Sequence, residues 1–211
     1  MTTIFLAVLS INIFFIYLIF SFTIYKKKTN ENFSIRNHFP FEIKQAKGSP
    51  TFFVNMFGLI ASILFLANFV FFFFKYTNFL HGVILFSALL AALSMVMVFV
   101  FNTYRLRTHC TFGIILIVSS FILNALLINQ EIAHFRAIQN PLIFIPMAIN
   151  VLVAAISGIG LFAPNLFDFS MLKSENGELF RPKTFILALV EWLLIIGLFL
   201  TQISLIFFEI I

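Results

Sequence analysis

Charged side chains are scarce in this sequence. Only 10% of its 211 residues are Asp, Glu, Lys or Arg, while 62% are hydrophobic and the mean hydropathy is +1.09. Soluble domains carry roughly 25% charged residues and are about half apolar. The composition therefore excludes a soluble domain and indicates a chain whose solvent is lipid.

Cysteine is almost absent, since Cys110 is the only one in the sequence. A single thiol excludes an internal disulfide and any metal cluster built on cysteine. His109 precedes it, and the two could be interpreted as a base and a nucleophile. Adjacent residues on a helix do not face each other, so catalysis by this pair is not expected.

Sequence signatures of several enzyme and channel classes are also missing. The chain has no P-loop, no zinc-protease His-Glu-x-x-His, no Gly-x-Ser-x-Gly elbow, no Thr-Val-Gly-Tyr-Gly filter and no arginine ladder. We recognise no known family from its residues. No cofactor is predicted, and a non-enzymatic function is favoured over an enzymatic one.

Long apolar runs make up most of the chain, and six of them are long enough to cross a bilayer as helices of about 20 residues. We predict an all-α fold: one integral membrane domain, 1–211, with spans at about 3–25, 51–74, 79–101, 110–129, 141–162 and 184–208. The first run is predicted to be a retained anchor rather than a cleaved signal, because its positive cluster follows the apolar stretch.

The positive charges predict on which side of the membrane each loop lies. Eleven of the 13 Lys and Arg residues fall in the first, third and fifth connections, and two fall in the second and fourth. Loops rich in Lys and Arg stay in the cytoplasm. Both termini are therefore predicted to lie outside, and the protein is predicted to reside in the cell (plasma) membrane.

The polar segment 26–50 carries six of these charges and interleaves them with aromatic and aliphatic residues. Such a loop could lie on the anionic inner leaflet or pack over the helix bundle. Lys26, Lys27 and Lys28 are predicted to contact anionic lipid head groups. The expected partners are the bilayer and other membrane subunits. No nucleic-acid partner is predicted, because the basic residues flank apolar spans.

Glu191 is the most informative single residue, because it lies seven residues inside the sixth predicted span. An acidic group at such depth costs about 2.5–3.5 kcal/mol on insertion scales, so its side chain is expected to face the interior of the bundle. There it could relay protons, bind a cation or pair with a basic substrate. Alternatively, it serves helix packing alone.

A second candidate lies in the fifth span, where Pro146 and Asn150 are about one helical turn apart. Proline has no N–H to donate to the carbonyl of Leu142, so a bend is expected there. Transporters use such bends and amide side chains at mid-membrane binding sites, although proline also serves plain packing in membrane helices. With Glu191, these two residues form the predicted substrate or ion path.

A weaker candidate is a metal site at the predicted outer face. Glu131 and His134 have the spacing of carboxylate-bridged metal sites in helical bundles, and His81 falls on the same predicted side of the membrane. A site of this type needs a second such pair. Polar residues that cap helix ends would give the same pattern.

Three classes of function follow from these candidates. The first is a small transporter, a channel or a membrane subunit of a transport system, and it predicts a polar cavity shared by Glu191 and Asn150. The second is a non-transporting assembly, immunity or sensor protein that acts through the loop 26–50, and it predicts a dry core and an exposed loop. The third is a membrane enzyme with the outer-face metal site.

Overall fold

The computed structural model describes residues 2–36, 38–40, 50–73, 79–100, 106–162 and 186–210. These ranges contain six helices that are long and apolar enough to cross a membrane, and no β-strand. The helices are α1 (Thr2–Thr29), α2 (Pro50–Phe73), α3 (Phe79–Val100), α4 (Leu106–Ile138), α5 (Phe144–Phe162) and α6 (Ile186–Ile210). The prediction of an all-α bundle with six transmembrane helices is confirmed.

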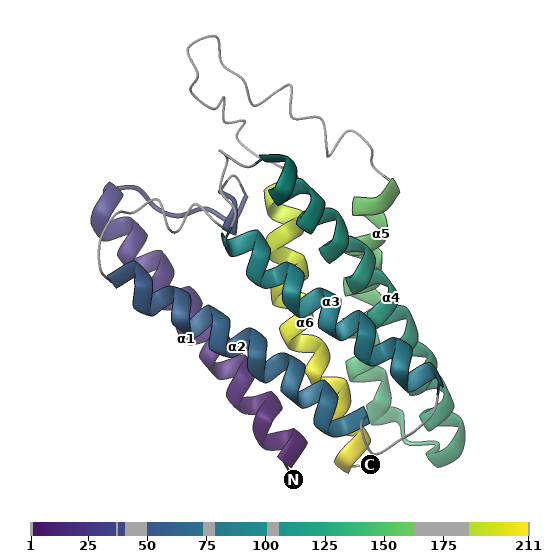
Figure 1. The fold of residues 1–211 in the computed structure, drawn as a ribbon. Helices are drawn as coiled ribbons and strands as arrows, with labels where there is room; N and C mark the ends of the chain where they lie inside the picture. The colour runs from purple at the N-terminus through teal and green to yellow at the C-terminus, as the bar shows by residue number, and fades with distance from the viewer. Residues whose placement is uncertain are drawn as a thin grey trace.

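Successive helices run in opposite directions, so both chain termini lie at the same end of the bundle (Figure 1). We call this end, where α1 begins and α6 ends, the terminal end. The opposite end, where α1 ends and α6 begins, is called the loop end. The orientation of the bundle in a membrane stays a prediction, in which the loop end faces the cytoplasm.

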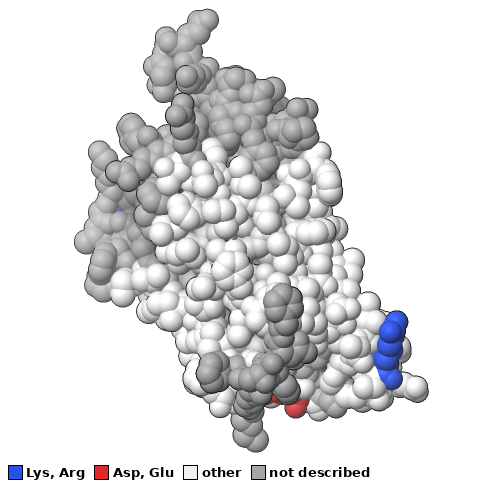
Figure 2. All heavy atoms as spheres, turned by 45° about the vertical axis from the view of Figure 1, so that its right-hand side comes forward, with Lys and Arg blue, Asp and Glu red and all other residues white. Residues whose placement is uncertain are grey.

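Helix α6 is the central helix of the bundle, and it packs against α1, α2, α4 and α5 (Figure 1). Within the described residues, the large apolar side chains exposed on α6 are those at its two ends, Ile186 and Ile210, whereas α1 to α5 expose such side chains along their length. Helices α1 to α5 therefore meet lipid and shield α6 from it. Figure 2 shows a broad uncharged face, with the charged atoms mainly at its lower margin.

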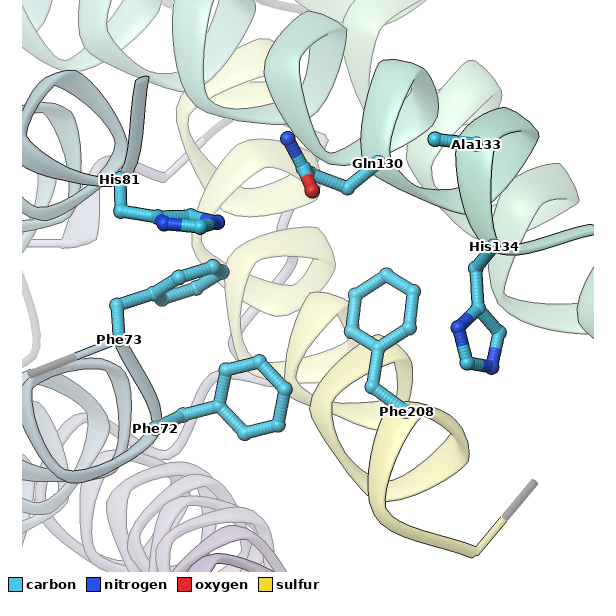
Figure 3. Close-up of a pocket in the computed structure, with 7 residues that line it drawn as sticks. All are labelled: Phe72, Phe73, His81, Gln130, Ala133, His134 and Phe208. Atoms are coloured by element: carbon cyan, nitrogen blue, oxygen red, sulfur yellow. The ribbon is translucent and has the colours of Figure 1, made fainter. Parts of the chain in front are cut away.

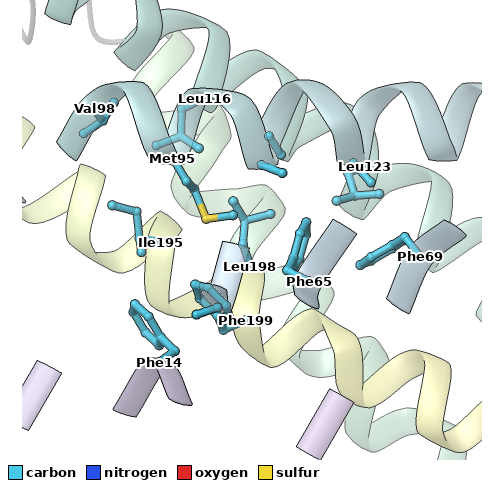
Figure 4. Close-up of a cluster of buried hydrophobic side chains, with 14 of the residues drawn as sticks. Phe14, Phe65, Phe69, Met95, Val98, Leu116, Leu123, Ile195, Leu198 and Phe199 are labelled. Carbon is cyan, nitrogen blue, oxygen red and sulfur yellow. The ribbon is translucent and has the colours of Figure 1, made fainter. Parts of the chain in front are cut away.

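Aromatic side chains hold α6 to its neighbours. Phe14 of α1 stacks on Phe199 of α6 with ring centroids 4.0 Å apart, and Phe65 of α2 meets Phe199 edge-on at 5.9 Å. Met95 of α3 and Leu116 of α4 extend the same buried cluster (Figure 4). Lipid tails are as apolar as these side chains, so the stabilisation comes from close packing rather than from escape from water.

Helix α4 is longer than predicted, because the expected polar break at 130–140 continues as helix to Ile138. The helix ends where Gln139 adopts a φ of 55° and its N–H donates to the carbonyl of Phe135 at 2.7 Å. A residue in the left-handed region is a common helix stop. The polar stretch stays helical because Glu131 is buried within the bundle.

Pro146 is accommodated without an interruption of α5. A single 3₁₀ turn, Pro141–Ile143, precedes the helix, and the side chain of Asn140 caps that turn by accepting the N–H of Leu142 at 3.0 Å. Since α5 begins at Phe144, Pro146 lies in its first turn. Backbone N–H groups have no partner within the helix there, so the bend expected from a missing N–H is not required.

Candidate functional site

The loop end contains a buried acid–base pair. His109 lies in the first turn of α4 and Glu191 in the second turn of α6, and Nε2 of the imidazole is 3.2 Å from Oε1 of the carboxyl group. Each side chain is only 1% exposed. Gly113 lies one turn further along α4, where a Cβ atom would stand 3.2 Å from Oε1 of Glu191. Glu191 thus faces the interior of the bundle and is closely surrounded.

Three residues of the first loop pack beside this pair, and we call Phe33, His38 and Phe39 the aromatic lid. The indole N–H of Trp192 donates to the carbonyl oxygen of His38 at 2.8 Å. Phe39 packs edge-on against the ring of His109, with centroids 5.6 Å apart. Phe33 stacks on His38 at 5.0 Å and meets Trp192 edge-on at 5.7 Å. The lid is therefore anchored to α6 directly beside Glu191.

The aromatic lid is the part of the loop 26–50 whose position the structure describes in most detail. Of the two expected positions, on the inner leaflet or over the bundle, the lid residues take the second. Lys26, Lys27 and Lys28 form the exposed last turn of α1. The loop residues 41–49 lie outside the described residues.

Three fully buried polar side chains form a second site toward the terminal end. Nδ2 of Asn150 in α5 donates to Oε1 of Glu131 in α4 and to Oγ of Ser204 in α6, both at 2.7 Å. All three side chains are 0% exposed. Oε2 of Glu131 and Oδ1 of Asn150 are buried without a hydrogen-bond partner among the described residues. The site joins three helices, and these two oxygen atoms can each still accept a hydrogen bond.

The two sites are well separated along α6. Ser204 follows Glu191 by 13 residues, which at 1.5 Å per residue is about 20 Å. Of the α6 residues buried between them, Leu194, Ile195 and Leu198 are apolar, whereas Thr201 and Gln202, nearer to Ser204, are polar. The polar cavity that the transport hypothesis predicts for Glu191 and Asn150 is therefore not formed by the described residues. Pro146 is buried one turn before Asn150, at the terminal-end site only.

A third polar cluster joins α1, α2 and α6. Nε2 of Gln202 donates to Oγ of Ser10 at 3.1 Å, and its Oε1 accepts from Nδ2 of Asn68 at 3.1 Å. Ser10 in turn donates to the carbonyl of Ala61 at 3.1 Å. Such bonds between membrane helices contribute about 0.6–1.7 kcal/mol each. We assign this cluster to helix association rather than to function.

The residues of the predicted metal site do not converge. The described residues contain no group of three or more His, Cys, Asp and Glu side chains placed to hold a metal ion. Glu131 turns toward Asn150, whereas His81 and His134 line a separate cavity of about 290 Å³ at the terminal end (Figure 3). The spacing of Glu131 and His134 predicts only that both side chains lie on the same face of α4. In the bundle, this face contacts more than one neighbouring helix, so the two side chains meet different partners.

Three contacts in these sites were not predicted, namely that of Glu191 with His109 and those of Asn150 with Glu131 and Ser204. A signal for the first exists in the sequence, because His109 and Glu191 are ionisable residues near the starts of two apolar spans that begin on the same predicted side. Ser204 carries no comparable signal, since serine is common in membrane helices.

The chain matches no protein-family model, no curated protein and no solved structure. The fold and the two sites define it as a multi-pass membrane protein of six apolar helices with carboxyl groups buried at both ends of the bundle.

Proposed function

We propose that this protein is a small proton-coupled transporter, or the membrane subunit of such a system. The observation that carries the proposal is the buried pair of His109 and Glu191 in apolar surroundings. Ionisable groups inside membrane helices are costly and are typical of proton relays and ion pathways. A pair kept only for packing is equally well replaced by apolar residues.

The chemistry of the pair suits proton exchange. A carboxyl group and an imidazole can each accept and release a proton, and the two facing atoms are 3.2 Å apart. The aromatic lid packs beside the pair at the loop end through the contact of Phe39 with His109. Displacement of the lid would therefore control access to Glu191 from that side.

The terminal-end site offers a second position at which a proton or a cation could bind. Oε2 of Glu131 and Oδ1 of Asn150 are oxygen acceptors without partners among the described residues, and such oxygens accept a proton donor or a cation. Apolar side chains of α6 lie between the two sites. A proton or a cation could therefore pass from one site to the other only if α6 moves relative to α4. We propose that the described conformation is the occluded one.

The proposal places the protein in the cell membrane with its loop end in the cytoplasm. Lys26, Lys27 and Lys28 would then lie at the inner leaflet, where each basic residue near an anionic surface contributes about 1 kcal/mol of attraction. Their position in the exposed last turn of α1 supports this contact. Additional membrane subunits would bind the lipid-facing helices α1 to α5.

The test is proton movement into liposomes that contain the purified protein and an entrapped pH-sensitive dye. Candidate solutes are added one at a time, with and without an imposed membrane potential. We expect Glu191→Gln to reduce solute-dependent proton movement at least tenfold, because an amide cannot carry the proton. Glu31→Gln is the matched control, since Glu31 is an exposed carboxyl group beyond α1, and it should leave the rate unchanged.

Two results would contradict transport. One is a wild-type protein that moves no protons with any solute or potential. The other is a Glu191→Gln variant with the wild-type rate. Thermal unfolding of both variants in detergent separates loss of function from loss of fold.

A non-transporting membrane partner is the second candidate function. The apolar layer between the two sites favours it, because a dry core is what that hypothesis predicts. The packed position of Phe33 and Phe39 opposes it, since those aromatic residues were expected to be exposed to a partner. The same liposome experiment decides between the two candidates.

A further inference from the structure

A row of aromatic rings lines the cavity at the terminal end, and two of its four ring contacts are edge-on, at 77°. Phe72 lies 4.9 Å from Phe73 and 5.8 Å from Phe208, measured between ring centroids. The imidazoles extend both ends of this row, with His81 at 5.2 Å from Phe73 and His134 at 5.3 Å from Phe208. Five rings from four helices thus line one cavity of about 290 Å³ (Figure 3).

The polar groups of the cavity carry hydrogen-bonding capacity without a fixed charge. Its described lining residues include no Asp, Glu, Lys or Arg. Gln130 extends its amide over the rings toward His81 (Figure 3). Nε2 of His134 is buried and has no hydrogen-bond partner among the described residues. Nε2 of an imidazole is a donor or an acceptor according to its tautomer, and the amide of Gln130 offers both a donor and an acceptor to a ligand.

These features together select a ligand class. Aromatic rings around a cavity favour a flat aromatic ligand, by stacking on a ring face or by edge-on contact. The lack of Asp, Glu, Lys and Arg among the described lining residues favours a neutral molecule. The amide N–H of Gln130 can donate to carbonyl oxygens on that ring. The volume lies at the lower limit of small-molecule sites, which suits one or two fused rings. We propose that this cavity binds a neutral, planar aromatic or quinone-type ring that bears hydrogen-bond acceptors.

The ring could reach the cavity from two sources. One is a membrane-dissolved quinone that carries an isoprenoid tail, and the other is a free aromatic molecule from the aqueous phase at the terminal end. Both present the same ring chemistry to His134 and Gln130. The proposal is independent of the proposed transport function, because it rests on different residues at the opposite end from Glu191.

Binding is measured by calorimetric titration of the full-length protein in detergent micelles. The two probes are 2-methyl-1,4-naphthoquinone and the same ring with a two-isoprene tail. Tighter binding of the tailed probe identifies the membrane source, and equal binding identifies the free ring. Both results support the proposed ring site.

Variants connect the measured binding to this cavity. Phe208→Leu should weaken binding about tenfold by loss of ring stacking, and His134→Phe should weaken it about fivefold by loss of a hydrogen bond while the row of aromatic rings is kept. Phe86→Leu is the matched control, because Phe86 is 60% exposed on α3, and it should bind as the wild type does. Gln130→Leu replaces Phe208→Leu if the latter unfolds.

The proposal is overturned if neither probe binds the wild-type protein. It is also overturned if the cavity variants bind as tightly as Phe86→Leu, which would indicate partition into the micelle. Finally, a Zn²⁺ titration that shows binding lost in His134→Phe, while both rings fail to bind, would make the cavity a metal site instead.

Discussion

The two ends of the bundle bury a carboxyl group in different ways. At the loop end, Glu191 faces the imidazole of His109, a group that can change its charge. At the terminal end, Glu131 accepts a hydrogen bond from the amide of Asn150, a group that cannot. The same helices, α4 and α6, contribute to both sites.

This difference assigns a different capability to each end. An imidazole facing a carboxyl group permits proton exchange between two titratable sites. An amide shared between a carboxyl group and the hydroxyl of Ser204 instead fixes the geometry of three helices. The loop end is therefore suited to a change of protonation. The terminal end is suited to binding a proton or a cation between side chains whose positions are fixed by hydrogen bonds.

The largest expected effect is at the loop end. His109→Leu leaves the carboxyl group of Glu191 buried without its partner, and breaking a buried pair in this way costs about 3–5 kcal/mol. We expect a loss of about 3 kcal/mol in the free energy of unfolding in detergent. In the double variant with Glu191→Leu, most of this loss should disappear, because an apolar pair removes the uncompensated group. An unchanged stability of His109→Leu would show that Glu191 does not depend on the imidazole.

A smaller effect is expected at the terminal end. Asn150→Leu removes two buried hydrogen bonds at similar side-chain volume, and we expect it to lower the free energy of unfolding by about 2 kcal/mol. Asn12→Leu is a suitable control, since Asn12 is exposed on α1, and surface substitutions change stability by about 0.5 kcal/mol or less. If Asn150→Leu and the control have the same free energy of unfolding, the amide does not hold the three helices together.

The smallest effect is expected at the lid. Trp192→Phe keeps an aromatic ring and deletes the hydrogen bond to the carbonyl of His38, a loss of about 1 kcal/mol. Cys110 is itself only partly buried, so lid opening is followed in a variant that combines Cys110→Ser with His38→Cys, because the His38 side chain is buried in the lid and a thiol there is labelled by a maleimide when the lid opens. Adding Trp192→Phe should raise the labelling rate about fivefold in membrane vesicles. An unchanged rate would mean that the hydrogen bond does not keep the lid closed.

The helices could be predicted from the sequence because the length of an apolar run is a local property. A bilayer requires about 20 apolar residues for each crossing, and α2 at Pro50–Phe73 and α3 at Phe79–Val100 differ from their predicted spans by one residue at most. The predicted end of α4 was wrong, because the polar stretch after 129 was expected to leave the helix. Its helical state depends on the burial of Glu131 against another helix.

The candidate site could be predicted only in part. The depth of Glu191 in an apolar span indicates an inward-facing group without reference to any neighbour. Its partner depends on how α4 is rotated about its own axis, which follows from packing across the whole bundle. The same limit applies to Asn150, which was expected to share a cavity with Glu191 and instead contacts Glu131.

The central position of α6 affects how the protein is made. The ribosome synthesises α6 after α1 to α5, although α6 packs against four of those helices. Until it inserts, Ser10 and Asn68 lack their partner Gln202, and Asn150 lacks Ser204. A nascent chain therefore holds polar side chains in lipid that the last span satisfies. Insertion of α6 is the step that supplies these polar side chains with their partners.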